Sequence, residues 1–148
     1  MDDRARVFVV CTDESGRYDT AVQRALDRAD AEGACVILYD VEAAGSPFSN
    51  PRPNEWAGEG EREQYDRPLD PVALEKLGRH GLALQVQRAR ERGIDAYGWL
   101  PDKAGGDALA AYAAQEHADL VLIPQDLDDP GITEYFEHEH PGVQVERV

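Results

Sequence analysis

A short apolar run near the start of the chain constrains the fold more than any other feature. Residues Val7 to Cys11 are all apolar, and Val9 and Val10 are β-branched. A run without polar alternation is typical of a strand covered on both faces. It stops at the turn-forming cluster Thr12 to Gly16, and a helical pattern follows. Because ligands of open α/β sheets bind at the carboxyl ends of the strands, Asp13 is predicted to lie at the mouth of any pocket.

The same alternation of strand and helix continues along the chain. Helices are predicted over Asp19–Glu32, from Asp70 to Gly93 and over Ala108–His117, with a brief one around Ile132–Glu137, and further strands over Cys35–Val41, Ile94–Leu100, Asp119–Ile123 and Val143–Val148. Right-handed crossovers then predict a single α/β domain over residues 1–148, with a doubly wound parallel sheet of five strands and helices on both faces.

Local signals set the ends of these elements. Asp19 and Asp70 are predicted to cap helices, and Gly33 suits a left-handed helix stop. Leu74, Leu77, Leu84 and Ala89 are predicted to form the buried side of the second helix, which Gly78 and Gly81 weaken unless they permit close packing. The third strand alternates, with Asp95, Tyr97 and Trp99 on one face, which predicts a half-exposed edge strand.

Residues 42–69 differ from the rest of the chain. They contain four prolines and many charged residues and show no periodicity. Structureless segments of this length are usually lids, binding loops or disordered. Phe48, Trp56 and Tyr65 are spaced through the segment and are expected either to hold it to its own domain or to cover a pocket or partner.

The charge of the chain excludes several classes of partner. The formal net charge is -15, from 30 acidic and 15 basic residues. This argues against duplex nucleic acid and anionic membranes, because phosphate contacts need clustered Lys and Arg. No apolar run reaches the roughly 18 residues that a membrane span needs, and the start of the chain lacks a signal peptide pattern. We therefore expect a cytoplasmic protein, whose acidic surface fits either a saline environment or a biased composition.

The sequence gives little indication of catalysis or of a resident metal. Ser15 has no nucleophile-elbow pattern around it. His138 and His140 lack a third ligand nearby and are interpreted as surface residues. Arg17 and Lys103 are the only basic residues placed at the predicted rim to meet an anion. As an alternative, Asp13, Asp40 and an acidic cluster after the fourth strand could assemble a divalent-cation site at the strand ends. That cluster consists of Asp126, Asp128 and Asp129.

Four segments give the chain a resemblance to the universal stress protein family. They are the strand ending Val9-Val-Cys-Thr-Asp13-Glu-Ser15, the helix from Ala21 to Ala29 with the following Gly33-to-Val41 strand, Gly93-Ile-Asp-Ala before Asp107, and Ala114-Gln-Glu-His-Ala-Asp119-Leu-Val-Leu-Ile123. The resemblance covers nearly the whole chain. It implies the sheet order 3-2-1-4-5 and, commonly, a homodimer.

The resemblance also implies a nucleotide pocket that this chain has in part lost. In members that bind ATP, the nucleoside is held at positions matching Asp13 and Val41, and Ser15 lies in the same loop. The phosphates lie on a loop spaced Gly-x2-Gly-x9-Gly-Ser/Thr after the fourth strand, where Gly131 and Thr133 would be the remaining contacts. Here the loop carries two prolines, which lack N–H donors, and three aspartates. Like charges about 4 Å apart cost roughly 4 kcal/mol at an effective dielectric near 20.

We therefore expect a non-catalytic, universal-stress-type protein of the subgroup that lacks the ATP-binding glycine loop, without a cofactor. Weak ATP turnover stays open. One alternative is an ATP- or AMP-binding member, loaded with Mg²⁺, with slow or no hydrolysis; the other is the cation-binding module. The alternating strand over 143–148 is a template for edge pairing, so a homodimer is expected through it. The stress, the protein partner and the physiological ligand are not indicated by the sequence.

Overall fold

The computed structural model describes residues 6–41, 68–101, 106–125, 127 and 143–148. Along the chain these form β1 (Val7–Thr12), α1 (Asp19–Glu32), β2 (Cys35–Asp40), α3 (Pro71–Lys76), α4 (His80–Glu91), β3 (Ala96–Trp99), α5 (Gly106–Gln115), β4 (Leu120–Ile123) and β5 (Gln144–Arg147). The segment 42–67 and the brief helix expected over 132–137 lie outside the described residues.

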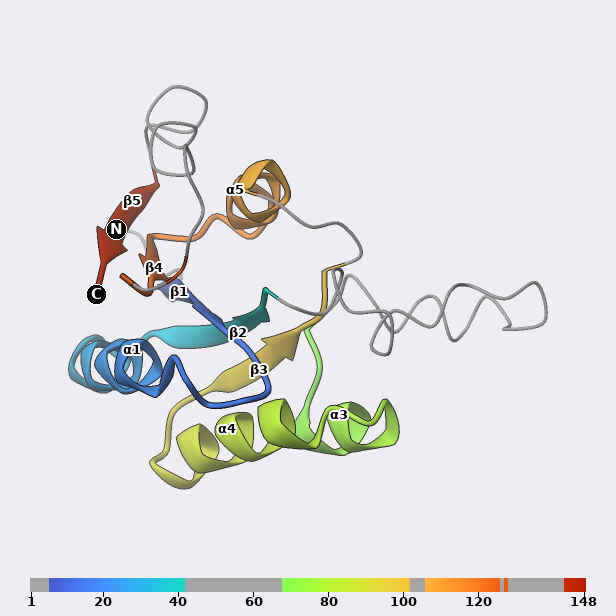
Figure 1. Cartoon of the computed structure of the whole chain (residues 1–148). Helices are drawn as coiled ribbons and strands as arrows, with labels where there is room; N and C mark the ends of the chain where they lie inside the picture. The colour runs from blue at the N-terminus through green and yellow to red at the C-terminus, as the bar shows by residue number, and fades with distance from the viewer. Residues whose placement is uncertain (1–5, 42–67, 102–105, 126, 128–142) are drawn as a thin grey trace.

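The strands form one parallel sheet in the order β3-β2-β1-β4-β5 (Figure 1). This confirms the predicted fold class and strand order. β1 lies at the centre of the sheet and pairs with β2 on one side and with β4 on the other. Its register with β2 runs from Val7 opposite Cys35 to Thr12 opposite Asp40. The carboxyl ends of β1 and β2 therefore lie side by side, which brings the residues that follow both strands to one edge of the sheet.

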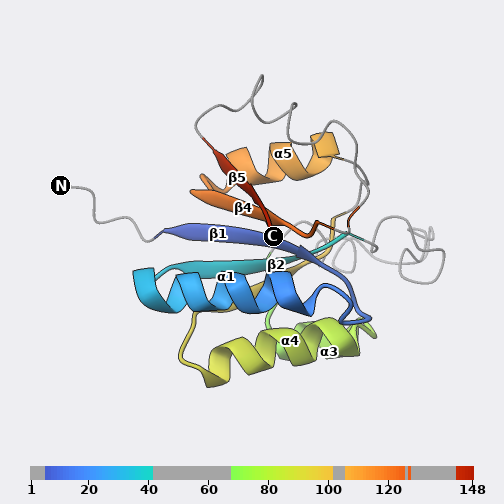
Figure 2. The ribbon, with the colours of Figure 1, turned by 60° about the vertical axis from the view of Figure 1, so that its left-hand side comes forward.

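Helices cover both faces of the sheet. Figure 2 shows α1, α3 and α4 on one face and α5 on the other. Alternate residues of each strand supply two separate cores, as the period of two requires. The first core contains Phe8, Val10, Leu26, Val36, Leu38, Leu82 and Val86, and the second contains Val9, Ile37, Trp99, Leu109, Tyr112 and Val121, among others. The continuous apolar runs of β1 and β4 are explained by this coverage on both sides.

The prediction of one continuous helix from Asp70 to Gly93 is wrong, because this range contains two helices, α3 and α4. The chain turns at Leu77 to Arg79, where Gly78 has a φ of 78° that only glycine adopts without strain. The turn shifts the helical phase, so that Leu84 is 48% exposed instead of buried. It also makes Arg79 the N-cap residue of α4, which places this side chain at the carboxyl edge of the sheet.

Two smaller predictions also need correction. The N-cap of α1 is Tyr18, so Asp19 is the first helical residue and provides no cap. β3 is an edge strand as predicted, but its Trp99 is buried because α5 covers it, with the ring centres of Trp99 and Tyr112 3.9 Å apart. The left-handed stop at Gly33 (φ 68°) and the Asp70 cap, which accepts from the Ala73 N–H, are confirmed. Among the described residues no helix has the length and apolar content needed to cross a bilayer.

Candidate functional site

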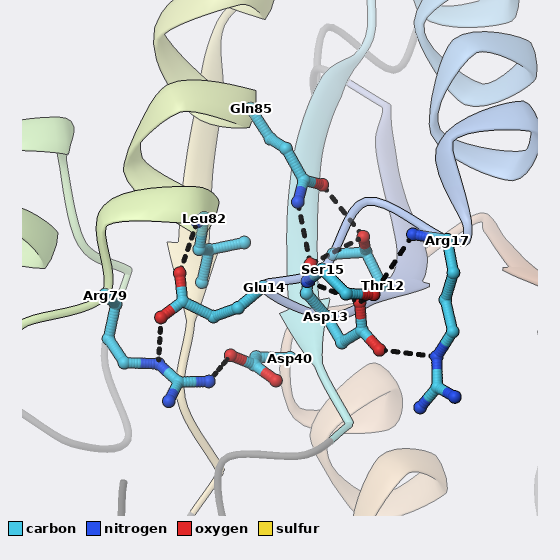
Figure 3. A network of polar contacts seen from close by, with 9 residues as sticks. All are labelled: Thr12, Asp13, Glu14, Ser15, Arg17, Asp40, Arg79, Leu82 and Gln85. Atoms are coloured by element: carbon cyan, nitrogen blue, oxygen red, sulfur yellow. Dashed lines mark hydrogen bonds and ion pairs between the residues drawn. The ribbon is translucent and has the colours of Figure 1, made fainter.

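The Asp13 carboxylate lies at the carboxyl end of β1 (Figure 3), as the sequence predicts. It is almost completely buried. Its Oδ1 accepts hydrogen bonds from the Ser15 N–H (2.9 Å) and the Ser15 hydroxyl (2.6 Å). Its Oδ2 accepts from the Arg17 Nε at 2.8 Å. The structure thus brings the predicted residues Asp13 and Ser15 together, and their hydrogen bonds are made within the same loop.

These contacts determine how Asp13 responds to pH. Burial raises the pKa of Asp13, but the hydrogen bonds from Ser15 and Arg17 and the nearby Arg17 charge outweigh burial and lower the pKa below its ordinary value of 3.8. A carboxyl group with a lowered pKa in the folded state stabilises the fold above its unfolded pKa, and this contribution disappears as the pH falls through the folded pKa.

We therefore expect the Asp13→Asn variant to be less stable than the parent protein at pH 5 to 7, with the difference shrinking below about pH 4. Urea unfolding of both proteins at pH 3, 5 and 7 measures this difference. The Asp30→Asn variant is a matched control on the exposed face of α1, where the Asp30 carboxylate lies 4.0 Å from Arg92. A stability difference for Asp13→Asn that persists unchanged at pH 3 contradicts the assignment.

A second carboxylate, Asp40, lies at the end of β2 and is fully buried. The Arg79 Nη2 donates to the Asp40 Oδ2, and the Arg79 side chain is itself only 11% exposed. The Arg79 Nε lies 3.6 Å from the Glu14 Oε1, which adds a weaker ion pair. Arg79 therefore joins the end of β2 to the loop that follows β1 (Figure 3).

The same loop is fastened to the first turn of α4. The Glu14 Oε2 accepts from the Leu82 N–H at 2.9 Å, so Glu14 caps the helix from a distant part of the chain. Gln85 accepts from the Thr12 hydroxyl at 2.8 Å and donates to the Asp13 carbonyl at 2.7 Å. A Cβ on Gly81 would lie 2.3 Å from the Glu14 carbonyl oxygen, so this close approach needs glycine.

The remaining predicted binding residues are only partly described. The Val41 N–H donates to the Thr12 carbonyl at 2.9 Å, which extends the ladder between β1 and β2 by one residue. Gly131 and Thr133 lie outside the described residues, as do Lys103 and the aspartates at 126, 128 and 129.

The chain directly after β4 is tied to the protein itself. The Gln125 N–H donates to the Val148 carbonyl (2.8 Å), and the Leu127 N–H donates to the Pro124 carbonyl (3.0 Å). Arg147 Nη2 contacts the carbonyl oxygens of Gln125 (3.4 Å) and Leu127 (3.2 Å). Since a phosphate cradle needs free backbone N–H groups, these two amides are not available to one.

Sequence reasoning missed Arg79 and Gln85, which reach the edge from α4. The expectation that Arg17 and Lys103 are the only basic residues at the rim is wrong, since Arg79 also lies there. Neither residue stands out by spacing, because each belongs to a helix that was expected to continue from Asp70. The sequence signal for this contact was Gly81, which weakens a helix unless it permits close packing. In the structure it packs closely against Glu14.

The described residues contain no group of three or more His, Cys, Asp and Glu side chains that could hold a metal ion. Asp13 and Asp40 each face an arginine, which competes electrostatically with a cation. The acidic residues at 126, 128 and 129, which the cation-site alternative also requires, are outside the described part of the chain.

Comparisons with solved structures place this geometry in a known fold. Two structures of a universal stress protein from Archaeoglobus fulgidus align with TM-scores of 0.57: one, 13% identical, covers 96% of this chain and 92% of its own, and the other, in complex with dAMP, is 12% identical and covers 97% of both. A universal stress protein in complex with cAMP is 20% identical over 97% of this chain and 96% of its own, with a TM-score of 0.53.

A family member from Burkholderia pseudomallei is 15% identical, covers 100% of this chain and 98% of its own, and has a TM-score of 0.56. No protein-family model matches the sequence, and no curated protein matches it. The resemblance inferred from the four sequence segments is therefore confirmed in three dimensions: this chain has the fold of the universal stress proteins.

Proposed function

We propose that this protein is a non-catalytic, universal-stress-type protein of the cytoplasm, in which the nucleotide pocket has degenerated. The observation that carries the proposal is that the polar groups described at the carboxyl edge are engaged by the protein itself. Asp13 is held by Ser15 and Arg17, and Asp40 is paired with Arg79. A nucleotide arriving at this edge meets a carboxylate that already accepts three hydrogen bonds.

The segment after β4 supports the same conclusion. The amides of Gln125 and Leu127 donate to carbonyl oxygens within the chain, and the sequence adds three aspartates and a proline before Gly131. The opposing observation is that two solved structures of the same fold are complexes with dAMP and cAMP. A nucleotide-binding protein with slow or no ATP hydrolysis is therefore the second candidate.

Thermal unfolding of the purified protein with and without millimolar ATP, AMP and Mg²⁺ separates the candidates. A ligand present at about 100 times its dissociation constant stabilises a protein by about 2.7 kcal/mol, which raises the midpoint by several degrees in a domain of this size. We expect no shift with any of the three. A shift with ATP or AMP favours the second candidate, and a shift with Mg²⁺ alone favours the cation-binding module.

We further propose that the protein forms a homodimer through β5. The two edges of the sheet differ: on β3, the N–H and carbonyl of Gly98 bond to Leu69 and the carbonyl of Ala96 accepts from Arg90. At the other edge, the Gln144 N–H donates to the carbonyl of Asp119, directly before β4, and the Val148 N–H donates to the carbonyl of Ile123 in β4. Because backbone groups alternate along a strand, those of Val145 point away from the sheet. An edge strand of this kind pairs readily with a second copy across a two-fold axis.

The Val145→Pro variant is expected to be monomeric, because proline removes the outward N–H without removing a bond to β4. Val145→Thr keeps the N–H and the β-branched shape, and is expected to remain dimeric. Light scattering after size-exclusion chromatography at micromolar concentration measures both masses. If the parent protein is monomeric, the proposed homodimer is wrong. If the Val145→Pro variant is dimeric, the dimer interface does not lie on β5.

A further inference from the structure

We propose that Arg17 is a specificity-determining residue of the carboxyl edge: its guanidinium pairs with the Asp13 carboxylate, at the position where the resemblance to nucleotide-binding universal stress proteins implies a nucleoside, and it thereby weakens nucleoside binding. This inference rests on the proposed function, because it gives a cause for the loss of nucleotide binding at the carboxyl edge of the sheet. It concerns the nucleoside part of a nucleotide, whereas the lost glycine loop concerns the phosphates.

The Asp13 carboxylate is oriented independently of Arg17. Both donors on Oδ1 come from Ser15, through its N–H and its hydroxyl, at 2.9 and 2.6 Å. The donor on Oδ2 is the Arg17 Nε at 2.8 Å. Removing the guanidinium therefore leaves the carboxylate in its present orientation, with one oxygen able to accept from the hydroxyl of a sugar.

The loop that carries Arg17 is held mainly by groups other than its guanidinium, which lies 5.0 Å from the centre of the Tyr18 ring. The Arg17 side chain is 56% exposed, whereas Asp13 is 4% exposed, so the arginine covers the carboxylate from the solvent side. Other contacts hold the loop: the Arg17 N–H donates to the Ser15 hydroxyl at 3.1 Å, and Glu14 and the Asp13 carbonyl bind to α4. Tyr18, which follows, is buried.

The size of the effect follows from the hydrogen bond at stake. A hydrogen bond to a charged acceptor corresponds to roughly a tenfold to hundredfold difference in affinity. A neutral hydroxyl competes poorly with a tethered guanidinium for a carboxylate that is itself buried, because the guanidinium is permanently charged and its effective concentration is high.

The test uses adenosine, which has no phosphate, and isothermal titration calorimetry on the full chain. Arg17→Ala and Arg17→Gln are expected to bind adenosine at least tenfold more tightly than the parent protein. Arg24→Ala, which changes an exposed arginine on α1, is the matched control and is expected to bind like the parent. The double variant Asp13→Asn/Arg17→Ala is expected to lose the gain.

Chemical competition gives a second readout on the same protein. Methylguanidinium at tens of millimolar is expected to bind the Asp13 carboxylate of Arg17→Ala where the arginine side chain is missing, and so to weaken adenosine binding to this variant. It is expected to leave adenosine binding to Arg24→Ala unchanged. Circular dichroism shows whether the Arg17 variants are folded. Should both folded Arg17 variants bind adenosine no better than the parent, the inference is overturned. ATP-induced stabilisation of the parent protein contradicts the proposed function. The Arg17 inference is decided separately, by the difference in adenosine affinity between the Arg17 variants and the parent, whether or not the parent binds ATP.

Discussion

Replacing Arg79 with alanine is expected to destabilise the protein by about 3–5 kcal/mol, the usual cost of removing one partner of a buried ion pair. The Asp40 carboxylate is fully buried, and the Arg79 guanidinium forms an ion pair with it. Truncation leaves this charge in a poorly solvated place at the end of β2. It also removes the contact between Arg79 and Glu14, which joins the β1–α1 loop to α4.

Chemical denaturation at pH 7 measures this loss, and two comparisons isolate its cause. Arg88→Ala removes an exposed arginine from the same helix and is expected to change stability by less than about 0.5 kcal/mol. Adding Asp40→Asn to Arg79→Ala replaces the buried charge with a neutral amide, so the double variant is expected to recover at least half of the loss. Strictly additive effects of the two substitutions would show instead that Arg79 stabilises the fold through its packing.

The architecture was predictable because its signals are local and strong. The runs at Val7 to Cys11 and Asp119 to Ile123 contain few polar residues, and only strands covered on both faces suit them. Gly33 ends α1 where expected, because glycine adopts a left-handed φ at little cost. Once strands and helices alternate, the preference for right-handed crossovers leaves few topologies, and the family resemblance indicated the observed strand order.

The sequence predicted only those site residues that directly follow a strand, because the end of the strand alone determines where they lie. Asp13 lies where the end of β1 puts it, but the partners of Asp40 and Glu14 come from the first turn of α4. Their positions depend on the turn at Gly78, since a continuous helix from Asp70 would present other residues to the edge. Sequence periodicity continues through such a turn, because Leu74 and Leu77 keep a helical spacing with Leu84. Only tertiary packing shows that the helix restarts with a different phase.

Gly81→Ala is expected to destabilise the protein by about 1–3 kcal/mol, the range for inserting an atom into a packed contact. Helix propensity alone predicts the opposite sign, because alanine is favoured over glycine in helices, by about 1 kcal/mol in the interior and by no more than that at Gly81, the second residue of α4. The structure decides between them: a Cβ at this position would lie 2.3 Å from the Glu14 carbonyl oxygen and 2.8 Å from its Oε2. Relief of the clash moves Glu14 away from the Leu82 N–H that it caps.

The identity of the clashing atom provides the control. Because the nearer contact is a backbone oxygen, removing the side chain with Glu14→Ala relieves only the 2.8 Å contact. Gly81→Ala is therefore expected to remain destabilising in the Glu14→Ala background, as measured by urea unfolding of the four proteins. Gln87→Ala, at an exposed position of the same helix, shows how an added alanine affects α4 at a position away from the β1–α1 loop, and is expected to change stability by less than about 0.5 kcal/mol. If Gly81→Ala stabilises the protein instead, the β1–α1 loop does not approach α4 this closely, and Glu14 does not cap the helix.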